Sequence, residues 1–155
     1  MKTLILYATK HGGAAEIGRR IAAKFDDVTL HDLKQPTADL SSYDCIIVGS
    51  SVYAGAFRKE AKLFLSQNGN ILKSKKLGLF VCAMSKGESD KIFADNISAD
   101  VLAVAKVTAL LGGLFDPKKA NFAERLIMRL VTKQSGYVDT IDNDKIEKFV
   151  VALQA

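Results

Sequence analysis

Residues 2–16 constrain the fold more than any other stretch of this chain. Residues 4–7 (Leu-Ile-Leu-Tyr) form an apolar run that is typical of a strand buried on both faces of a parallel sheet. The run stops at residues 8–13, which include two glycines, and helical spacing follows at once. Ile17, Ile21 and Phe25 recur every four residues on one helix face. The segment therefore predicts a strand, a short turn and a helix.

The turn between this strand and this helix has the features of a phosphate-binding loop. The helix N-terminus offers unpaired backbone N–H groups and a partial positive charge. Gly12 and Gly13 let the backbone approach a phosphate, and Thr9 adds a hydroxyl donor. Because the loop has neither GxGxxG nor a Gly-Lys-Ser/Thr ending, a dinucleotide site and a nucleotide-hydrolysing P-loop are disfavoured. A small phosphate monoester remains as the ligand, and an ordinary strand-to-helix turn remains the alternative.

Strand and helix patterns alternate along the rest of the chain. Further strands are predicted at residues 28–33, 45–49, 77–83 and 107–111. Helices are predicted at residues 57–65 (inner face Phe57, Ala61, Phe64 and Leu65), within residues 89–103, and around Ile146, Phe149, Val150 and Leu153. Strands separated by helices imply right-handed crossovers. We therefore expect an α/β fold, an open sheet of five parallel strands with helices on both faces.

Composition and residue usage fit a single domain spanning residues 1–155. The chain is 48% hydrophobic, and no apolar run reaches the roughly 20 residues that span a bilayer. Because the N-terminus shows no signal-peptide pattern, we expect a cytoplasmic protein. Cys45 and Cys82 lie in apolar strand runs, so both are expected to be reduced and buried. With only His11 and His31 in the chain, we expect no metal site.

The carboxyl ends of the parallel strands are where an open sheet of this kind binds ligands. Three predicted loops meet there, at residues 9–14, 50–56 and 84–88. In the second loop, small residues let the backbone approach a flat ligand, and the ring of Tyr53 can stack on it. The alternative for Tyr53 is a half-buried loop tyrosine that covers the sheet edge. The third loop supplies backbone N–H groups and carbonyls around Gly87.

Two motifs lie at these loops: Lys-Thr-Leu-Ile-Leu-Tyr-Ala-Thr-Lys-His-Gly at residues 2–12 and Gly-Ser-Ser-Val-Tyr-Ala-Gly at residues 49–55. Both resemble the flavodoxin family of FMN-binding domains. Residues 112–117 and 122–130 are similar to the branch that contains menaquinone-dependent protoporphyrinogen dehydrogenase. The resemblance runs from the first strand to the last helix. It implies a flavodoxin-like sheet with strand order 2-1-3-4-5 and FMN as the cofactor.

The resemblance and the loop patterns together assign the cofactor site to these three loops. The expected site consists of Thr9, Lys10, His11, Gly12, Gly13 and Ala14 at the phosphate, Ser51, Val52, Tyr53, Ala54 and Gly55 beside the flavin, and Met84, Ser85 and Gly87 in the third loop. Two features depart from the family pattern. Ala14 stands where many members carry a hydroxyl residue, and the third loop has no aromatic residue before Phe93 to provide a second stacking ring.

Positive charge bears on the choice of partner. The formal net charge of +5 favours anionic partners, whereas electron-shuttling flavodoxins are strongly acidic. A predicted helix at residues 122–133 has a basic stripe beside an apolar one, formed by Arg125, Arg129 and Lys133 and by Phe122, Leu126 and Leu130. Such a helix can lie on an anionic membrane or meet an acidic partner. The alternative is a helix packed on the core with a solvated basic face, and no motif indicates nucleic acid binding.

The patterns support three hypotheses about function. No residue group predicts nucleophilic or metal-assisted catalysis, so no catalytic side chain is assigned and the flavin would carry the redox chemistry. The leading hypothesis is an FMN-dependent oxidoreductase of heme biosynthesis, with protoporphyrinogen IX as donor and a quinone as acceptor. The alternatives are a flavodoxin-type electron carrier without its own substrate and a cofactor-free interaction module. The leading hypothesis predicts peripheral contact with the inner face of the cell membrane through residues 122–133.

Overall fold

The computed structural model describes residues 1–37, 39–84, 87–133 and 136–155. Within these residues, five parallel strands form one sheet in the order β2-β1-β3-β5-β6. Their bounds are Thr3–Ala8 for β1, Val28–Asp32 for β2, Cys45–Tyr53 for β3, Lys76–Cys82 for β5 and Ala105–Leu110 for β6. The predicted order 2-1-3-4-5 is confirmed, because the remaining member of the sheet, the two-residue strand β4 (Ala56–Phe57), pairs antiparallel with β3 alone.

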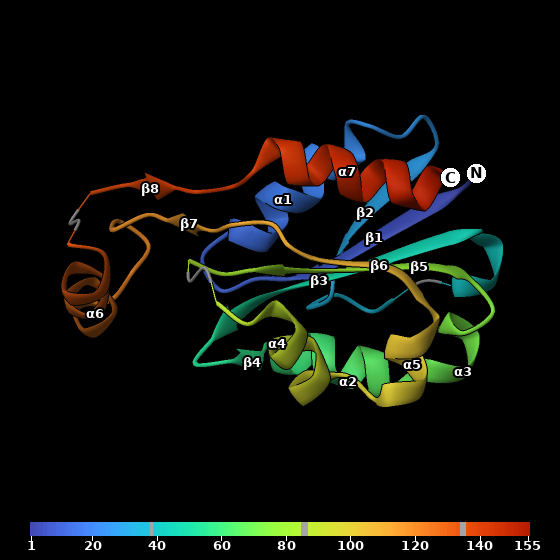
Figure 1. The fold of residues 1–155 in the computed structure, drawn as a ribbon, viewed down its shortest axis with the longest axis horizontal. Helices are drawn as coiled ribbons and strands as arrows, with labels where there is room; N and C mark the ends of the chain where they lie inside the picture. The colour runs from blue at the N-terminus through green and yellow to red at the C-terminus, as the bar shows by residue number, and fades with distance from the viewer. Residues whose placement is uncertain (38, 85–86, 134–135) are drawn as a thin grey trace.

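Helices cover both faces of the sheet, as predicted (Figure 1). One face carries α1 (Gly13–Ala22) and α7 (Asn143–Gln154). The other face carries α2 (Lys59–Gln67), α3 (Gly69–Leu72), α4 (Ser89–Asn96) and α5 (Ala99–Val104), while a 3₁₀ turn at Leu40–Ser42 leads into β3. Because the five strands are parallel, all of their carboxyl ends lie at one edge, which is the left-hand edge of the sheet in Figure 1.

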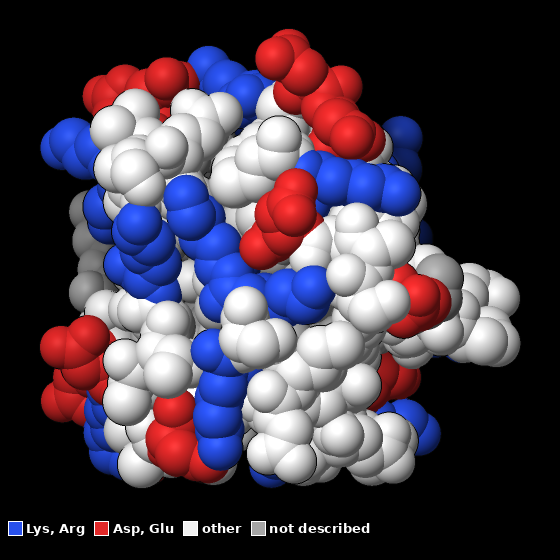
Figure 2. Space-filling view, turned by 90° about the vertical axis from the view of Figure 1, so that its right-hand side faces the viewer, with Lys and Arg blue, Asp and Glu red and all other residues white. Residues whose placement is uncertain are grey.

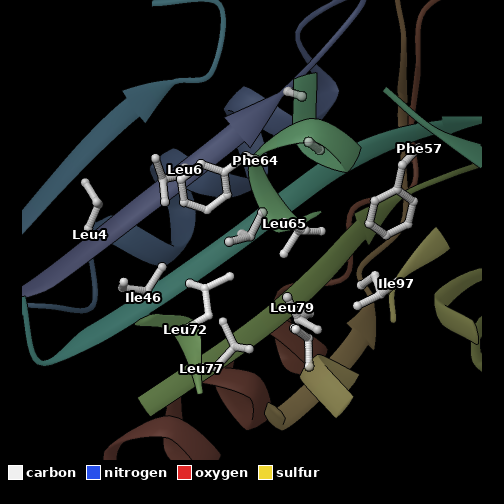
Figure 3. Close-up of a cluster of buried hydrophobic side chains, with 14 of the residues drawn as sticks. Leu4, Leu6, Ile46, Phe57, Phe64, Leu65, Leu72, Leu77, Leu79 and Ile97 are labelled. Carbon is white, nitrogen blue, oxygen red and sulfur yellow. The ribbon is translucent and has the colours of Figure 1, made fainter. Parts of the chain in front are cut away.

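Two hydrophobic clusters, one on each face, form the core. Alternate residues of β1 point to opposite faces, because side chains in a strand alternate. Leu4 and Leu6 join the cluster that includes Phe64 of α2 (Figure 3), whereas Ile5 joins the cluster under α1 and α7. Both sides of the central strands are therefore buried, which explains their continuous apolar runs.

Tertiary contacts move several element boundaries from their predicted positions. The predicted loop at residues 50–56 is instead a hairpin: β3 continues to Tyr53, and Phe57 lies in β4 and not in the following helix. Ala54 and Gly55 turn the chain with φ of 50° and 78°, the left-handed conformation of a two-residue hairpin loop. The side chain of Asn96 ties α4 to this hairpin by donating to the Gly55 carbonyl at 2.8 Å and accepting from the Phe57 N–H at 2.9 Å.

Other predicted helices are also shorter in the structure. The helix predicted within residues 89–103 is divided into α4 and α5, because the residue after Asn96, Ile97, is extended. Phe25 lies beyond the end of α1, although it still packs against the same cluster as Ile17 and Ile21. Cys45 and Cys82 are buried free thiols, as predicted.

One helix lies beyond the carboxyl edge of the sheet (Figure 1). This helix, α6 (Phe122–Thr132), lies at the end of an arm formed by the antiparallel strands β7 (Leu114–Phe115) and β8 (Val138–Asp139) (Figure 1). The predicted helix is confirmed, but it is not packed on the core. Phe122, Leu126 and Leu130 are 75%, 47% and 73% exposed. In the described part of the chain, no helix combines the length and apolarity needed to cross a membrane.

Candidate functional site

The loop between β1 and α1 presents the N-terminus of α1 at the carboxyl edge of the sheet. Gly12 is the N-cap residue, with φ of 93°, and no side chain caps the helix. Its own N–H donates to Thr9 Oγ1 at 2.9 Å, and the N–H of Lys10 donates to Ser51 Oγ at 3.3 Å. These bonds hold the loop against β3, while the first amides of the helix have no intrahelical acceptors. The local geometry is therefore that of an anion-binding helix terminus.

Two lysines and a histidine lie at this helix terminus. The Nζ of Lys119 lies 3.5 Å from the position that a Cβ on Gly12 would occupy. Lys10 Nζ is 2.9 Å from Glu124 Oε1, and His11 Nε2 contacts the other oxygen of the same carboxylate. The hydrogen bond from Lys10, followed by that from His11, lowers the pKa of Glu124 against the opposing effect of burial. Glu124 of α6 is therefore held as a carboxylate against the loop at residues 9–14.

A cavity adjoins the loop and extends along the sheet edge. Its volume is about 150 Å³, and its lining is formed by Lys10, His11, Gly13, Ser51, Val52, Tyr53, Arg58, Cys82, Ala83, Met84, Gly113, Leu114, Phe115, Glu124, Ile127 and Met128. Most of these side chains are apolar. Tyr53 is 63% exposed and not half-buried, and the Nζ of Lys10 lies 5.9 Å from its ring centroid. The Nε of Arg58 is buried without a hydrogen-bond partner in the described residues.

The structure brings together many of the residues selected from the sequence. Of those, Lys10, His11, Gly13, Ser51, Val52, Tyr53 and Met84 line this one cavity. Thr9, Gly12 and Ala14 belong to the adjoining loop and helix terminus, and Ala54 and Gly55 form the hairpin turn beside Tyr53. Gly87 instead lines a separate, shallow hollow at the start of α4. Ser85 lies outside the described residues.

Several lining residues were not selected from the sequence. Leu114, Phe115 and Glu124 reach the cavity from the arm and α6, and Arg58 reaches it from the residue before α2. The first three lie at residues 112–117 and 122–130, the two stretches that resemble one branch of the family. That resemblance could therefore have pointed to these residues as part of the site. Arg58 carried no local pattern that distinguishes it from other surface arginines.

Positive charge is not confined to α6. Figure 2 shows the face at which the strands begin, opposite the cavity, and Lys and Arg side chains form a band across it, interrupted by Asp and Glu. Two lysines near the starts of β5 and β6 make hydrogen bonds: Lys75 Nζ donates to the Tyr43 carbonyl at 2.7 Å, and Lys106 Nζ donates to the Ala155 backbone oxygen at 2.8 Å. The net charge of +5 therefore includes residues far from α6 (Figure 2), and charge alone does not single out α6.

Comparison with known proteins defines the class of this domain. Residues 4–141 match the family model described as flavodoxin domain, and the chain belongs to this family. No sequence among the curated proteins gives a significant match.

Solved structures show the same fold. Rubredoxin oxygen:oxidoreductase from Desulfovibrio gigas has a TM-score of 0.62 and 16% identity, with 99% of this chain and 36% of that chain covered. This chain therefore spans about a third of that protein. Flavodoxin 2 from Bacillus cereus has a TM-score of 0.61 and 22% identity, with 99% and 98% covered. A flavoprotein from Lactobacillus acidophilus NCFM in complex with FMN has a TM-score of 0.52 and 20% identity, with 72% and 91% covered.

Proposed function

We propose that this domain binds FMN at the cavity and transfers electrons or hydrogen through it. The observation that supports this most strongly is that a helix terminus and an apolar cavity adjoin each other in one site. An uncapped helix terminus with Lys10, His11 and Lys119 nearby suits a phosphate, and the adjoining apolar cavity with an exposed tyrosine suits a flat ring. That a flavoprotein of the same fold holds FMN supports the same assignment.

The residues of the loop and the cavity have distinct roles in this proposal. The loop at residues 9–14 holds the phosphate through its backbone, and Thr9 keeps that loop in shape. Tyr53 lies on one side of the ring, with Val52 beside it. Met84, Leu114 and Phe115 supply apolar surface at the place where the third loop lacks an aromatic residue. Arg58, whose Nε is buried and unpartnered among the described residues, would donate to an acceptor on the ring.

Bound FMN would supply the redox chemistry, and the protein would set the orientation of the ring and the access to it. We propose a protoporphyrinogen-type dehydrogenase with a quinone acceptor, because residues 112–117 and 122–130 resemble that branch. The net charge of +5 also favours anionic substrates and membranes over basic partner proteins. An electron carrier without its own substrate is the second candidate. Anaerobic oxidation of protoporphyrinogen IX with menaquinone distinguishes the two, because only the first turns the substrate over.

Replacing Tyr53 with alanine should weaken FMN binding by about fivefold, or about 1 kcal/mol, because an aromatic contact to the ring is lost. Titration of cofactor-depleted protein by quenching of flavin fluorescence measures this change. Because Tyr53 is 63% exposed, the melting temperature of the cofactor-free protein should stay the same. Tyr53→Phe is the matched control and should retain the affinity. Equal affinities for all three proteins would place Tyr53 outside the ring site.

We further propose that α6 contacts an anionic membrane surface. Its exposed Phe122, Leu126 and Leu130 would enter the interface, and its arginines would meet lipid phosphates. The FMN-supplemented protein should sediment with vesicles containing anionic phosphatidylglycerol and not with neutral phosphatidylcholine vesicles. Binding should fall as salt approaches 0.15 M, where the Debye length is about 8 Å.

Charge reversal tests which surface meets the membrane. Changing Arg125, Arg129 and Lys133 to glutamate should abolish vesicle binding and leave the affinity for FMN within about twofold. A control with equal charge change replaces three exposed lysines on other helices, Lys59, Lys62 and Lys148. This control should still bind vesicles. Failure of the wild-type protein to bind anionic vesicles at low salt would refute the membrane proposal.

A further inference from the structure

One carboxylate bridges α6 to the loop at residues 9–14. Glu124 contacts both Lys10 and His11, two consecutive residues of the loop, and its side chain is only 15% exposed. Glu124 lies in the first turn of α6, where its N–H donates to the side-chain oxygen of Asn121 at 2.8 Å. The helix that carries the carboxylate therefore begins at a capped, fixed position. Glu124 thus connects the arm to the very side chains that surround the anion-binding helix terminus.

Four apolar side chains of α6 are exposed. Phe122, Leu126 and Leu130 face solvent, and Ile127, which lines the cavity, is still 43% exposed. The contacts of Glu124 with Lys10 and His11 therefore contribute to the position of α6 against the β1–α1 loop.

We propose that Glu124 is a latch that occupies the position of a ligand phosphate, so that binding of a phosphate monoester displaces it and releases α6. This inference rests on the proposed FMN site. A phosphate monoester carries a charge of about −1.5 to −2 and three acceptor oxygens, against a single negative charge on Glu124. A phosphate can bond to Lys10 and His11 and also to the open amides of α1. The carboxylate loses its partners and is repelled by the bound anion.

The latch makes the position of α6 depend on the phosphate and not on the flavin ring alone. Riboflavin, which has the ring but no phosphate, leaves Lys10 and His11 paired with Glu124. FMN exchanges that pairing for a stronger one, because charge-assisted hydrogen bonds strengthen with the charge of the acceptor. A ligand shifts such an equilibrium only through its different affinity for the two states. Glu124 is thus a specificity-determining residue. It lowers the affinity for FMN, and it makes the position of α6 depend on whether the phosphate is bound.

The isosteric, neutral variant Glu124→Gln tests the proposal. It should bind FMN about tenfold more tightly than the wild type, because no charged carboxylate has to be displaced, and riboflavin affinity should change by less than about twofold. In the wild type, FMN should accelerate hydrogen–deuterium exchange of the amides in α6, and riboflavin should not. In Glu124→Gln, exchange in α6 should already be fast without ligand. Glu147→Gln, which removes a carboxylate paired with Lys24 on the far helices, is the matched control and should behave as wild type.

Different outcomes refute the latch and the proposed function. Unchanged or weaker FMN binding by Glu124→Gln, or slower exchange in α6 on FMN binding to the wild type, would overturn the latch and leave FMN binding intact. If neither protein binds FMN, the proposed function fails, and inorganic phosphate then tests the latch by itself. Faster exchange in α6 of the wild type with phosphate would support the latch. No change with phosphate would overturn it.

Discussion

Replacing Gly49 with alanine should lower the free energy of unfolding by about 3 kcal/mol, because the added methyl group has no room. Gly49 lies opposite Phe80 in the pairing of β3 with β5. A Cβ on Gly49 would lie 1.9 Å from Cζ of the Phe80 ring, far inside van der Waals contact. The ring cannot simply turn aside, because it is fully buried and meets Phe149 of α7 edge to face, with centroids 6.4 Å apart.

Denaturant unfolding and thermal melting measure this effect, with an expected drop in melting temperature of about 10 °C for a domain of this size. Gly87→Ala is the control, because a Cβ there meets no atom within 4 Å, and its stability should stay within about 0.5 kcal/mol of the wild type. Adding Phe80→Leu to Gly49→Ala should recover part of the loss as a coupling energy. A decrease in the free energy of unfolding below about 1 kcal/mol for Gly49→Ala would show that the side chains around Phe80 can rearrange to admit the methyl group.

Replacing Gly12 with valine should weaken FMN binding by about a hundredfold, or about 2.7 kcal/mol. The cause is backbone conformation more than crowding. Gly12 has φ of 93°, which a β-branched residue adopts only with strain, whereas the nearest atom to its Cβ position is Lys119 Nζ at 3.5 Å. Relief of that strain would rotate the loop and withdraw its amides from the phosphate.

Fluorescence titration with FMN measures this loss, and titration with riboflavin separates phosphate binding from ring binding. The affinity for riboflavin should fall much less, because the ring contacts come from other loops. Gly136→Val, at a position where a Cβ meets no atom within 4 Å, is the control and should bind FMN as the wild type does. Equal FMN affinity for Gly12→Val and wild type would remove the β1–α1 loop from the site.

The sheet could be predicted because its strands are buried on both faces. Residues 4–7 and 45–48 are continuous apolar runs for that reason. The residues after Ala8 mark the end of β1, whereas β3 continues through Gly49 and two serines to Tyr53. Boundaries were less accurate where contacts from distant residues decide them. Phe57 reads as the first apolar residue of a helix, but Asn96, 39 positions away, accepts from its N–H and holds it in β4.

The turn between β1 and α1 could also be predicted, since residues 9–14 are contiguous and their properties are local. Thr9 bonds within the loop and Gly12 takes the positive φ that only glycine adopts at little cost. The other walls of the cavity could not be found in this way. Glu124 meets Lys10 across 114 positions of sequence, and no periodicity or spacing relates the two residues.

The amino-acid sequence by itself determined the alternation of strands and helices, the loop at residues 9–14 and the amphipathic character of α6, because each depends on the properties of neighbouring residues. Tertiary structure alone decided that α6 lies off the core, that its apolar side chains stay exposed, and that Glu124 reaches Lys10 and His11. The physical reason is that an amphipathic pattern indicates only that a helix has an apolar face. The arm formed by β7 and β8 determines where the helix lies, and therefore whether that face is buried or exposed.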